Sequence, residues 1–205
     1  MVDATPTPFP LERQARLAVF ASGRGSNLAS LLAAFPPHGE EPLAAVRLVL
    51  SERAEAAALE RAAAAGVAAV HVPFGRDREA FERRAEALLR EHAIDLVCLA
   101  GFMRVLSARF VAAWEGRLLN VHPSLLPAFR GLHAQRQALA AGVHESGCTI
   151  HFVDAGIDTG RAIVQRRVPV HGGDDEDSLA ARILEQEHMA YPEAVRLVLR
   201  GEVTP

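Results

Sequence analysis

The sequence predicts a single-domain α/β protein whose mostly parallel, twisted sheet is flanked by helices. Short apolar runs alternate with helix-like segments, which is the pattern of parallel strands joined by helical crossovers. The first apolar run ends in a Gly-rich turn that leads into a helix, and two apolar runs follow one another late in the chain, before a last helix. These two late strands could add an antiparallel edge to the sheet.

Seven strands are expected, each as a short apolar run. They cover residues 17–21, 45–50, 68–72, 96–100, 118–121, 149–153 and 162–170. Four helices are expected, over residues 28–35, 54–65, 78–92 and 177–200. Apolar positions at three- and four-residue spacing support the helix over 78–92, and Gly66 is a suitable residue to follow the end of the helix over 54–65.

Length and composition indicate one domain. The 205 residues, half of them apolar, suffice for one large core and are too few for two ordinary domains. Residues 1–16, rich in Pro, Thr and charge, are expected to form a flexible extension, which leaves residues 17–205 as the folded domain. The formal net charge is −3, so we expect small-molecule substrates, with neither nucleic acid nor a membrane as partner.

Several kinds of chemistry are not expected. All basic residues are Arg and none is Lys, which excludes a Schiff-base mechanism. Cys98 and Cys148 form no Cys-x-x-Cys pair, so neither a disulfide framework nor a thiolate metal site is indicated, and a cytoplasmic protein is expected. No apolar run approaches the length of a membrane span, and the N-terminus lacks the pattern of a signal peptide.

A carboxamide and an imidazole lie two residues apart at the end of the fifth predicted strand. Residues i and i+2 of a strand project from the same face, so Asn120 and His122 can point into one pocket. Pro123 and Pro127 then prevent simple continuation of the strand. A neutral donor beside a titratable group suits reactions in which a carbonyl oxygen gains negative charge and a proton moves, as in acyl or formyl transfer.

The turn after the first strand could hold a phosphate. Gly23 and Gly25 lack the third Gly of a dinucleotide fingerprint, and no acidic residue ends the second strand, because Ser51 precedes Glu52. A nicotinamide cofactor is therefore not expected. The free N–H groups of the helix start, with Ser26 and Asn27, can bind one phosphate, and the alternative is a tight turn with a helix cap.

The segment from Gly147 to Gly160 carries a strand into a loop with two carboxylates. Gly156 and Gly160 leave the backbone free to take positive φ and to approach a ligand closely. Asp158 could stabilise the imidazolium of His122, although a single loop Asp is more commonly a cap. His151 alternates with apolar residues, which favours a supporting role on the sheet face. No compact His-x-x-x-His spacing occurs, so no metal site is expected.

Six segments together make the sequence similar to one family. The chain resembles the phosphoribosylglycinamide formyltransferases, folate-dependent enzymes of purine synthesis with a Rossmann-like formyltransferase fold. The resemblance runs from about Leu17 to Gly201 and rests on Gly25-Ser-Asn27, Leu99-Ala-Gly-Phe-Met-Arg-Val-Leu106, Asn120-Val-His-Pro-Ser-Leu-Leu-Pro127, Gly131-Leu-His133, Asp158-Thr-Gly160 and Gln186-Glu-His188.

The resemblance implies formyl transfer from 10-formyltetrahydrofolate, as cosubstrate, to the amine of 5-phosphoribosylglycinamide, without a metal. It implies that His122 is the general acid, that Asn120 is the second oxyanion donor and that Asp158 keeps His122 charged. It further implies that Gly25, Ser26, Asn27 and Glu187 bind the glycinamide ribonucleotide, and that the folate contacts Arg78, Met103, Arg104, Val105, Leu106 and Asn120. A monomer or a homodimer is expected.

Three residues depart from the family pattern. Arg130 and Arg161 replace a frequent Pro, and Gln135 replaces a frequent His.

Three other functions compete with this one. A formyltetrahydrofolate hydrolase would deliver the formyl group to water, and a methionyl-tRNA formyltransferase would deliver it to aminoacyl-tRNA. We expect neither, because 205 residues leave no room for their added domains and the chain is acidic. A non-catalytic nucleotide or folate sensor would leave Asn120, His122 and Asp158 without a role.

Overall fold

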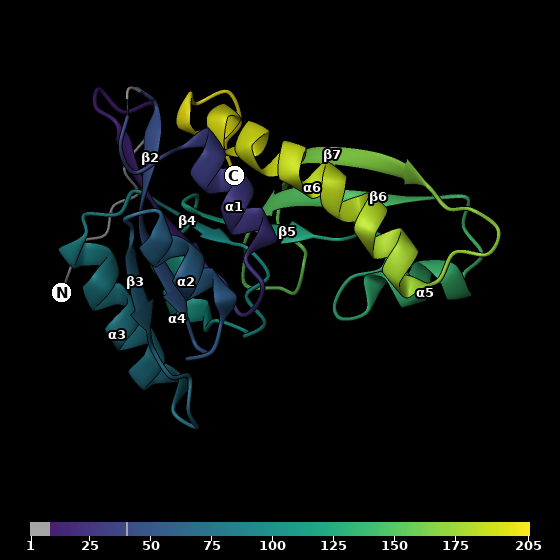
Figure 1. The fold of residues 1–205 in the computed structure, drawn as a ribbon, viewed down its shortest axis with the longest axis horizontal. Coiled ribbons are helices and arrows are strands. Elements are labelled where there is room, and N and C mark those ends of the chain that lie inside the picture. The colour runs from purple at the N-terminus through teal and green to yellow at the C-terminus, as the bar shows by residue number, and fades with distance from the viewer. Residues whose placement is uncertain (1–8, 40) are drawn as a thin grey trace.

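The protein forms one seven-stranded sheet covered on both faces (Figure 1). The computed structural model describes residues 9–39 and 41–205. The strands are β1 (Ala15–Phe20), β2 (Ala44–Ser51), β3 (Ala68–His71), β4 (Leu96–Leu99), β5 (Leu118–His122), β6 (Glu145–Phe152) and β7 (Ala162–Pro169). The helices are α1 (Ser26–Ala34), α2 (Ala57–Ala64), α3 (Arg78–Glu91), α4 (Ala108–Ala113), α5 (Ala134–Ala140) and α6 (Glu176–Leu199).

The sheet is parallel over its first five strands and antiparallel at one edge. Its order is β3-β2-β1-β4-β5-β6-β7, and β6 pairs antiparallel with both β5 and β7. All seven predicted strands and the antiparallel edge are confirmed. The carboxyl ends of β1, β4 and β5 meet at one edge of the sheet, which is where ligands bind in open α/β sheets.

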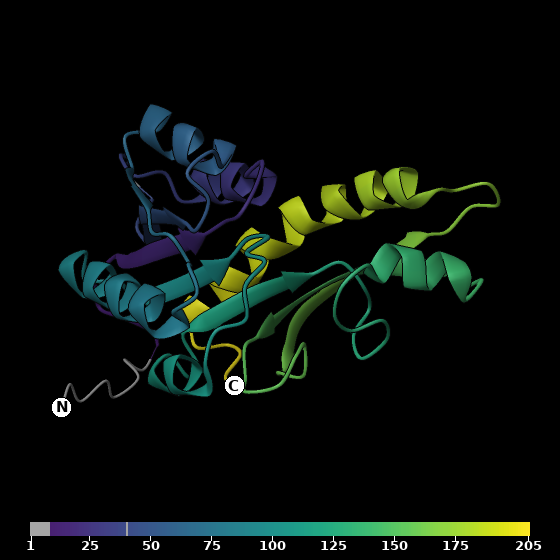
Figure 2. The same ribbon diagram turned by 90° about the horizontal axis from the view of Figure 1, so that it is seen from below.

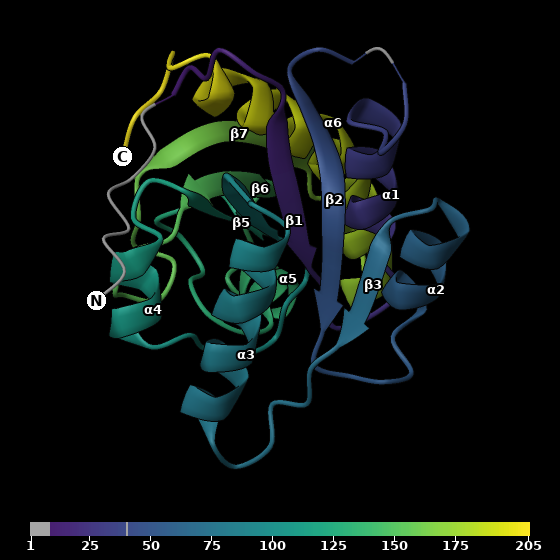
Figure 3. The same cartoon turned by 90° about the vertical axis from the view of Figure 1, so that its left-hand side faces the viewer.

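Two buried clusters occupy the two faces of the sheet. Alternate residues of β1 belong to different clusters, with Leu17 and Val19 on one face and Ala18 and Phe20 on the other. The first cluster packs under α1, α2, α5 and α6, and the second under α3 and α4. Figure 3 shows this division, with α3 and α4 on the near face of the sheet and α1 and α6 behind it.

Helices α4 and α5 were not predicted, because local signals for them are weak. Both are short, with six and seven residues. The Ser107 side chain caps α4 by accepting a hydrogen bond from the Phe110 amide, and Ser107 is itself held by Glu82 of α3. Helix α5 starts after His133, which has a left-handed conformation and supplies no side-chain cap among the described residues. In Figure 2, α5 lies beside the N-terminal end of α6.

The folded domain begins earlier than predicted. Residues 1–8 of the expected extension lie outside the described residues, but residues 9–16 belong to the fold. Phe9 and Leu11 pack against the core, and Arg13 donates two hydrogen bonds of 2.8 and 2.7 Å to Asp95. The placement of residues 9–16 in a flexible extension is therefore wrong, because these long-range contacts compensate for a sequence rich in Pro and charge.

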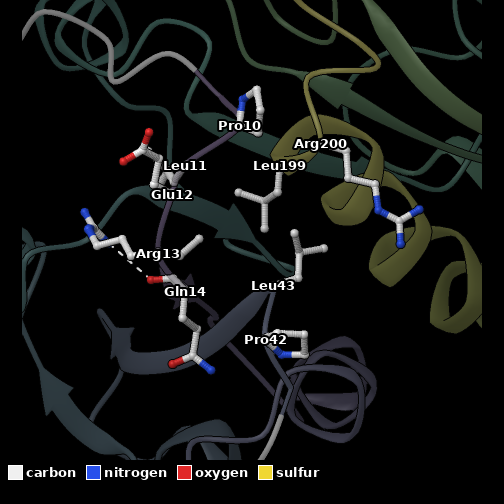
Figure 4. Close-up of a pocket in the computed structure, with 10 residues that line it drawn as sticks. Pro10, Leu11, Glu12, Arg13, Gln14, Pro42, Leu43, Leu199 and Arg200 are labelled. Atoms are coloured by element: carbon white, nitrogen blue, oxygen red, sulfur yellow. Dashed lines mark hydrogen bonds between the residues drawn. The ribbon is translucent and has the colours of Figure 1, made fainter.

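A small hollow of about 190 Å³ separates this N-terminal segment from the end of α6. Figure 4 shows Leu43 and Leu199 facing one another across it, with Pro10 and Leu11 alongside. It lies at the amino ends of β1 and β2, away from the predicted site residues. Within the described ranges, none of the helices is both long enough and apolar enough to pass through a bilayer.

Candidate active site

A cavity of about 1130 Å³ opens at the carboxyl ends of the parallel strands. It brings together residues from segments that lie far apart in the sequence. The predicted residues that line it are Asn27, Met103, Arg104, Val105, Leu106, Asn120, His122, Asp158 and Glu187. Gly25, Ser26 and Arg78 are not among the lining residues. Gly25 and Ser26 nevertheless adjoin the cavity, because Arg24 and Asn27 on either side of them line it.

Asn120 and His122 line this cavity from the C-terminal end of strand β5. Their i, i+2 spacing gives them the same face, as the sequence predicted. His122 is buried, with 5% of its surface exposed, so its ring is held in a defined position.

Both ring nitrogens of His122 face acceptors. Nδ1 lies 3.2 Å from Oδ2 of Asp158, and Nε2 lies 2.8 Å from the carbonyl oxygen of Phe129. A neutral imidazole has one N–H and can satisfy only one of these acceptors, whereas an imidazolium donates to both. The surroundings of His122 therefore suit the charged ring, which is the form that a general acid needs.

The position of Asp158 depends on its own backbone conformation and on a hydrogen bond from the loop that contains Gly131. Its φ is +52°, in the left-handed region that Asp adopts more readily than most residues. Its Oδ2 also accepts a hydrogen bond of 2.9 Å from the Gly131 amide. Burial raises the pKa of Asp158, but hydrogen bonds from His151 and Gly131 and the charge of His122 outweigh burial and lower the pKa overall. Asp158 is thus the ionised partner of His122 at neutral pH.

The glycines of this loop serve a different purpose from the one expected. Neither Gly156 nor Gly160 uses its freedom to take positive φ, whereas Asp158 between them has a positive φ. Glycine is required at both positions because neighbouring atoms occupy the space that a Cβ would need. A Cβ on Gly156 would lie 2.0 Å from Oγ1 of Thr159, and one on Gly160 would lie 1.9 Å from the Phe152 carbonyl oxygen.

His151 of β6 links the carboxamide to the carboxylate. It is the register partner of Asn120, and its Nε2 lies 3.2 Å from Nδ2 of Asn120 and 3.6 Å from Oδ1 of Asp158. Its Nδ1 donates to the carbonyl oxygen of Phe152 at 2.7 Å. When neutral with the proton on Nδ1, the ring accepts from Asn120, and when charged it donates toward Asp158. These contacts give His151 the supporting position that the sequence suggested.

A second polar pair lies beside the start of α1. Asn27 donates a hydrogen bond of 2.7 Å to Oε2 of Glu187 on α6, and both residues are at least nine-tenths buried. Burial raises the pKa of Glu187, and the hydrogen bond from Asn27 opposes that shift. Among the described residues, Oδ1 of Asn27 has no hydrogen-bond partner although it is buried. Such an orphaned acceptor suits a ligand that carries a donor.

The start of α1 provides free donors for an anion. Gly25 precedes the helix in a left-handed conformation, and the first turn of the helix contains no acidic residue. Gly25 supplies no side-chain cap, so the first N–H groups of α1 have positive potential, and Arg24 and Asn27 on either side of the helix start line the cavity.

The loop from Gly101 to Leu106 forms an apolar wall of the cavity. Met103 and Val105 line it and are each 64% exposed, which is high for large apolar side chains. Met103 and Val105 are therefore not core residues, whereas Leu106 is 8% exposed and packs in the core as well. Exposed apolar side chains beside backbone donors and acceptors suit a flat heterocycle.

Arg78 is not among the residues that line the cavity, and it pairs with Glu82 one turn along α3, at 3.9 Å. Conversely, the cavity wall includes Leu132 and Ile157, which were not predicted and are 67% and 61% exposed. The signal for both was present, because each is an apolar residue in an otherwise polar loop. Gln135 also lines the cavity, whereas Arg161 donates to the carbonyl oxygen of Thr204.

The structure describes no group of three or more His, Cys, Asp or Glu side chains that could hold a metal ion, a statement that covers residues 9–39 and 41–205. The side chains described above that face the cavity are two carboxamides (Asn27 and Asn120), two imidazoles (His122 and His151) and two carboxylates (Asp158 and Glu187), and the N-terminus of helix α1 lies beside them. This set can bind an anion and a flat apolar group together, and can stabilise an oxyanion between them.

Comparisons with known proteins point in one direction. Residues 15–195 match the formyl transferase family. The chain is 45% identical over 179 residues to phosphoribosylglycinamide formyltransferase of Escherichia coli, which covers 86% of this chain and 83% of that protein. It is 49% identical over 193 residues to the trifunctional purine biosynthetic protein adenosine-3 of Drosophila melanogaster, covering 93% of this chain but only 14% of that longer protein.

Solved structures share the fold. The crystal structure of glycinamide ribonucleotide transformylase 1 from Symbiobacterium toebii superposes with a TM-score of 0.86 and 46% sequence identity, covering 92% of this chain and 89% of that one. The phosphoribosylglycinamide formyltransferase from Brucella melitensis gives a TM-score of 0.84 at 43% identity, covering 93% and 98%.

Proposed function

The chain belongs to the formyl transferase family, and on that premise we propose that it transfers the formyl group of 10-formyltetrahydrofolate to the amine of 5-phosphoribosylglycinamide in purine biosynthesis. The observation that carries the proposal is the meeting of Asn120, His122 and Asp158 in one cavity, with the Asn27–Glu187 pair beside them. Both substrates are small molecules. We place the reaction in the cytoplasm, with a monomer or a homodimer as the working form and neither nucleic acid nor a membrane as partner.

The acceptor would occupy the side of the cavity formed by α1 and α6. Its phosphate would bind at Gly25, Ser26 and Asn27, where the N-terminus of α1 supplies positive potential. Glu187 and the orphaned oxygen of Asn27 would accept hydrogen bonds from its hydroxyl or amine groups.

The folate would occupy the opposite, apolar side. Met103 and Val105 would contact its ring, and Arg104 and Leu106 would complete the wall, while backbone groups of this loop pair with the ring edge. Arg78 is proposed for the folate tail, because it lies half-exposed at the start of α3. Asn120 would contact the formyl group at the junction of the two sides.

The chemistry follows from the charges in the cavity. The acceptor nitrogen attacks the formyl carbon, and the oxygen of the tetrahedral intermediate becomes an oxyanion between Asn120 and His122. The new C–N bond persists, the bond from carbon to the folate nitrogen breaks, and the amine proton passes to that nitrogen. His122 would donate a hydrogen bond to the oxyanion through its Nε2 proton. The bond from Nε2 to the neutral Phe129 carbonyl is weaker than the charge-assisted bond from Nδ1 to Asp158, so the Nε2 proton is the easier one to redirect.

Product analysis tests the proposal. The protein is incubated with 10-formyltetrahydrofolate, with and without glycinamide ribonucleotide, and products are separated by chromatography. Formylated glycinamide ribonucleotide together with tetrahydrofolate is expected. Formate in place of the amide would show delivery to water, and unchanged substrates would contradict catalysis altogether.

A further inference from the structure

A buried carboxylate lies behind the loop that forms the apolar wall. Glu52 directly follows the last residue of β2, and its side chain is 2% exposed. An acidic residue at this position of a dinucleotide-binding sheet would bind a ribose. Here both carboxylate oxygens already have partners from other loops, so Glu52 serves another purpose.

One oxygen of Glu52 acts through Ser22, in the turn after β1. The Ser22 hydroxyl donates a hydrogen bond of 2.9 Å to Oε2 of Glu52 and accepts one of 2.8 Å from the Met103 amide. A hydroxyl has a single proton, so donating it to Glu52 leaves its lone pairs directed at Met103. Glu52 thereby orients the group that fixes the Met103 backbone.

The other oxygen acts on Arg104. Oε1 of Glu52 lies 3.7 Å from Nε of Arg104, whose guanidinium lies 5.1 Å from the centre of the Phe74 ring. Arg104 is half-exposed and lines the cavity. The carboxylate and the ring thus both contact the guanidinium, and the buried carboxylate balances its charge.

Packing alone cannot position this part of the loop. Phe102 is anchored by the rings of Phe20 and Phe81, at centroid distances of 5.5 and 5.7 Å. Met103 and Val105, which follow, are mostly exposed and have little packing to hold them. Their positions therefore depend on the backbone contact to Ser22 and on the anchoring of Arg104 between them.

We propose that Glu52 is a positioning residue for the folate side of the active site, acting through Ser22 and Arg104 on the segment from Met103 to Val105. The inference deepens the proposed function and rests on it for the identity of the ligand. Because the acceptor side is built from α1 and α6, removal of Glu52 weakens folate recognition and spares the acceptor.

Steady-state kinetics of four variants test the proposal. Glu52→Ala should raise the KM for 10-formyltetrahydrofolate about tenfold, with the KM for the acceptor and kcat within about twofold of wild type. Glu52→Gln keeps an oxygen acceptor for Ser22 and should raise it only about threefold. Ser22→Ala should resemble Glu52→Ala. The matched control is Glu55→Gln, an exposed acid three residues away that pairs only with Arg53 among its described neighbours and should change nothing.

Hydrogen exchange of the ligand-free protein provides a readout that does not depend on catalysis. The Met103 amide should exchange faster in Glu52→Ala and Ser22→Ala than in wild type or Glu55→Gln, because its acceptor is lost or misdirected. Equal exchange at Met103 and equal folate KM in Glu52→Ala would overturn the proposal. If Glu52→Ala does not fold, Glu52→Gln and Ser22→Ala decide the outcome by the same two measurements.

Failure of the proposed function is recognised separately. Calorimetric titration of the wild type with tetrahydrofolate should show binding, and absence of binding would contradict folate as the ligand. In that case the assignment of Glu52 to folate recognition falls too, while the exchange of Met103 still shows whether Glu52 holds the loop.

Discussion

At the scale of single residues, the site is organised by pairs in which one member holds the other. Asp158 holds His122, and His151 contacts both Asp158 and Asn120. Asn27 holds Glu187 on the acceptor side. In each pair a buried polar group has its partner supplied by a different segment of the chain, so the loss of one member leaves the other unsatisfied.

Asp158→Asn should lower turnover by about 10²–10⁴-fold without unfolding the protein. The substitution keeps the shape of the side chain and a possible hydrogen bond but removes the negative charge that faces Nδ1 of His122. Turnover and a thermal melt of the same preparation measure the two effects. Near-normal turnover would show that His122 does not depend on this charge.

Glu187→Gln should stabilise the protein at neutral pH and not in acid. Burial raises the folded-state pKa of Glu187. The contribution of this side chain to the stability of the wild type is therefore fully present below the ordinary Glu pKa of about 4.3, and it is lost as the pH rises through the raised folded-state pKa. The Gln oxygen can still accept from Asn27. Melting temperatures of both proteins from pH 4 to 8 should therefore diverge toward neutral pH, while the KM for the acceptor increases. A difference independent of pH would contradict the argument.

At the scale of elements, strand β5 and the loop after β6 carry the reactive groups, and the glycines of the loop after β6 allow other atoms to approach closely. Gly131 donates to Asp158, and Gly160 packs directly on the Phe152 carbonyl at the end of β6. Helix α6 supplies Glu187 from its central turns, while Tyr191, one turn on, donates to the carbonyl oxygens of Leu99 and Leu119. These hydrogen bonds fix the position of α6 along β4 and β5.

Gly160→Ala should destabilise the protein by about 1–3 kcal/mol and lower turnover as well. The added Cβ would lie 1.9 Å from a backbone oxygen, so the strand end and the loop that carries Asp158 must move apart. Gly172→Ala is the matched control, since nothing lies within 4 Å of its Cβ and its φ is not positive. Urea unfolding measures both variants, and equal midpoints for the two would refute the close-approach argument.

At the scale of the whole molecule, both hydrophobic clusters share one sheet. The central strands contribute alternate residues to each face, so neither cluster can form without the strands of the other. Helix α6 contacts β6, β7 and α1, which ties the antiparallel edge to the parallel half of the sheet, as Figure 1 shows.

The two faces should therefore unfold together. Trp114, the single tryptophan, is 8% exposed and lies in the cluster under α3 and α4, so its fluorescence reports on one face. Far-UV circular dichroism reports on the whole sheet. The two probes should give the same urea midpoint, and separate midpoints would show that the faces unfold independently.

The order of the strands and of the four expected helices followed from the sequence because local patterns specify it, whereas α4 and α5 were missed. Apolar runs identified all seven strands, and the i, i+2 spacing placed Asn120 and His122 on one face. The motif Asn120 to Pro127 and the resemblance that it supports predicted the function now proposed. Gly66, at φ +73°, follows α2 as expected, because the left-handed position after a helix favours Gly.

Tertiary structure alone decided the rest, because the deciding contacts join residues far apart in the chain. The pairing of His122 with Asp158 spans 36 positions, and that of Asn27 with Glu187 spans 160. Arg13 is held by Asp95, helix α4 is capped with help from Glu82, and Glu52 reaches Ser22 and Arg104 from neighbouring strand ends. Burial, hydrogen bonding and charge at such positions depend on which segments the fold brings together, and local periodicity carries no record of that.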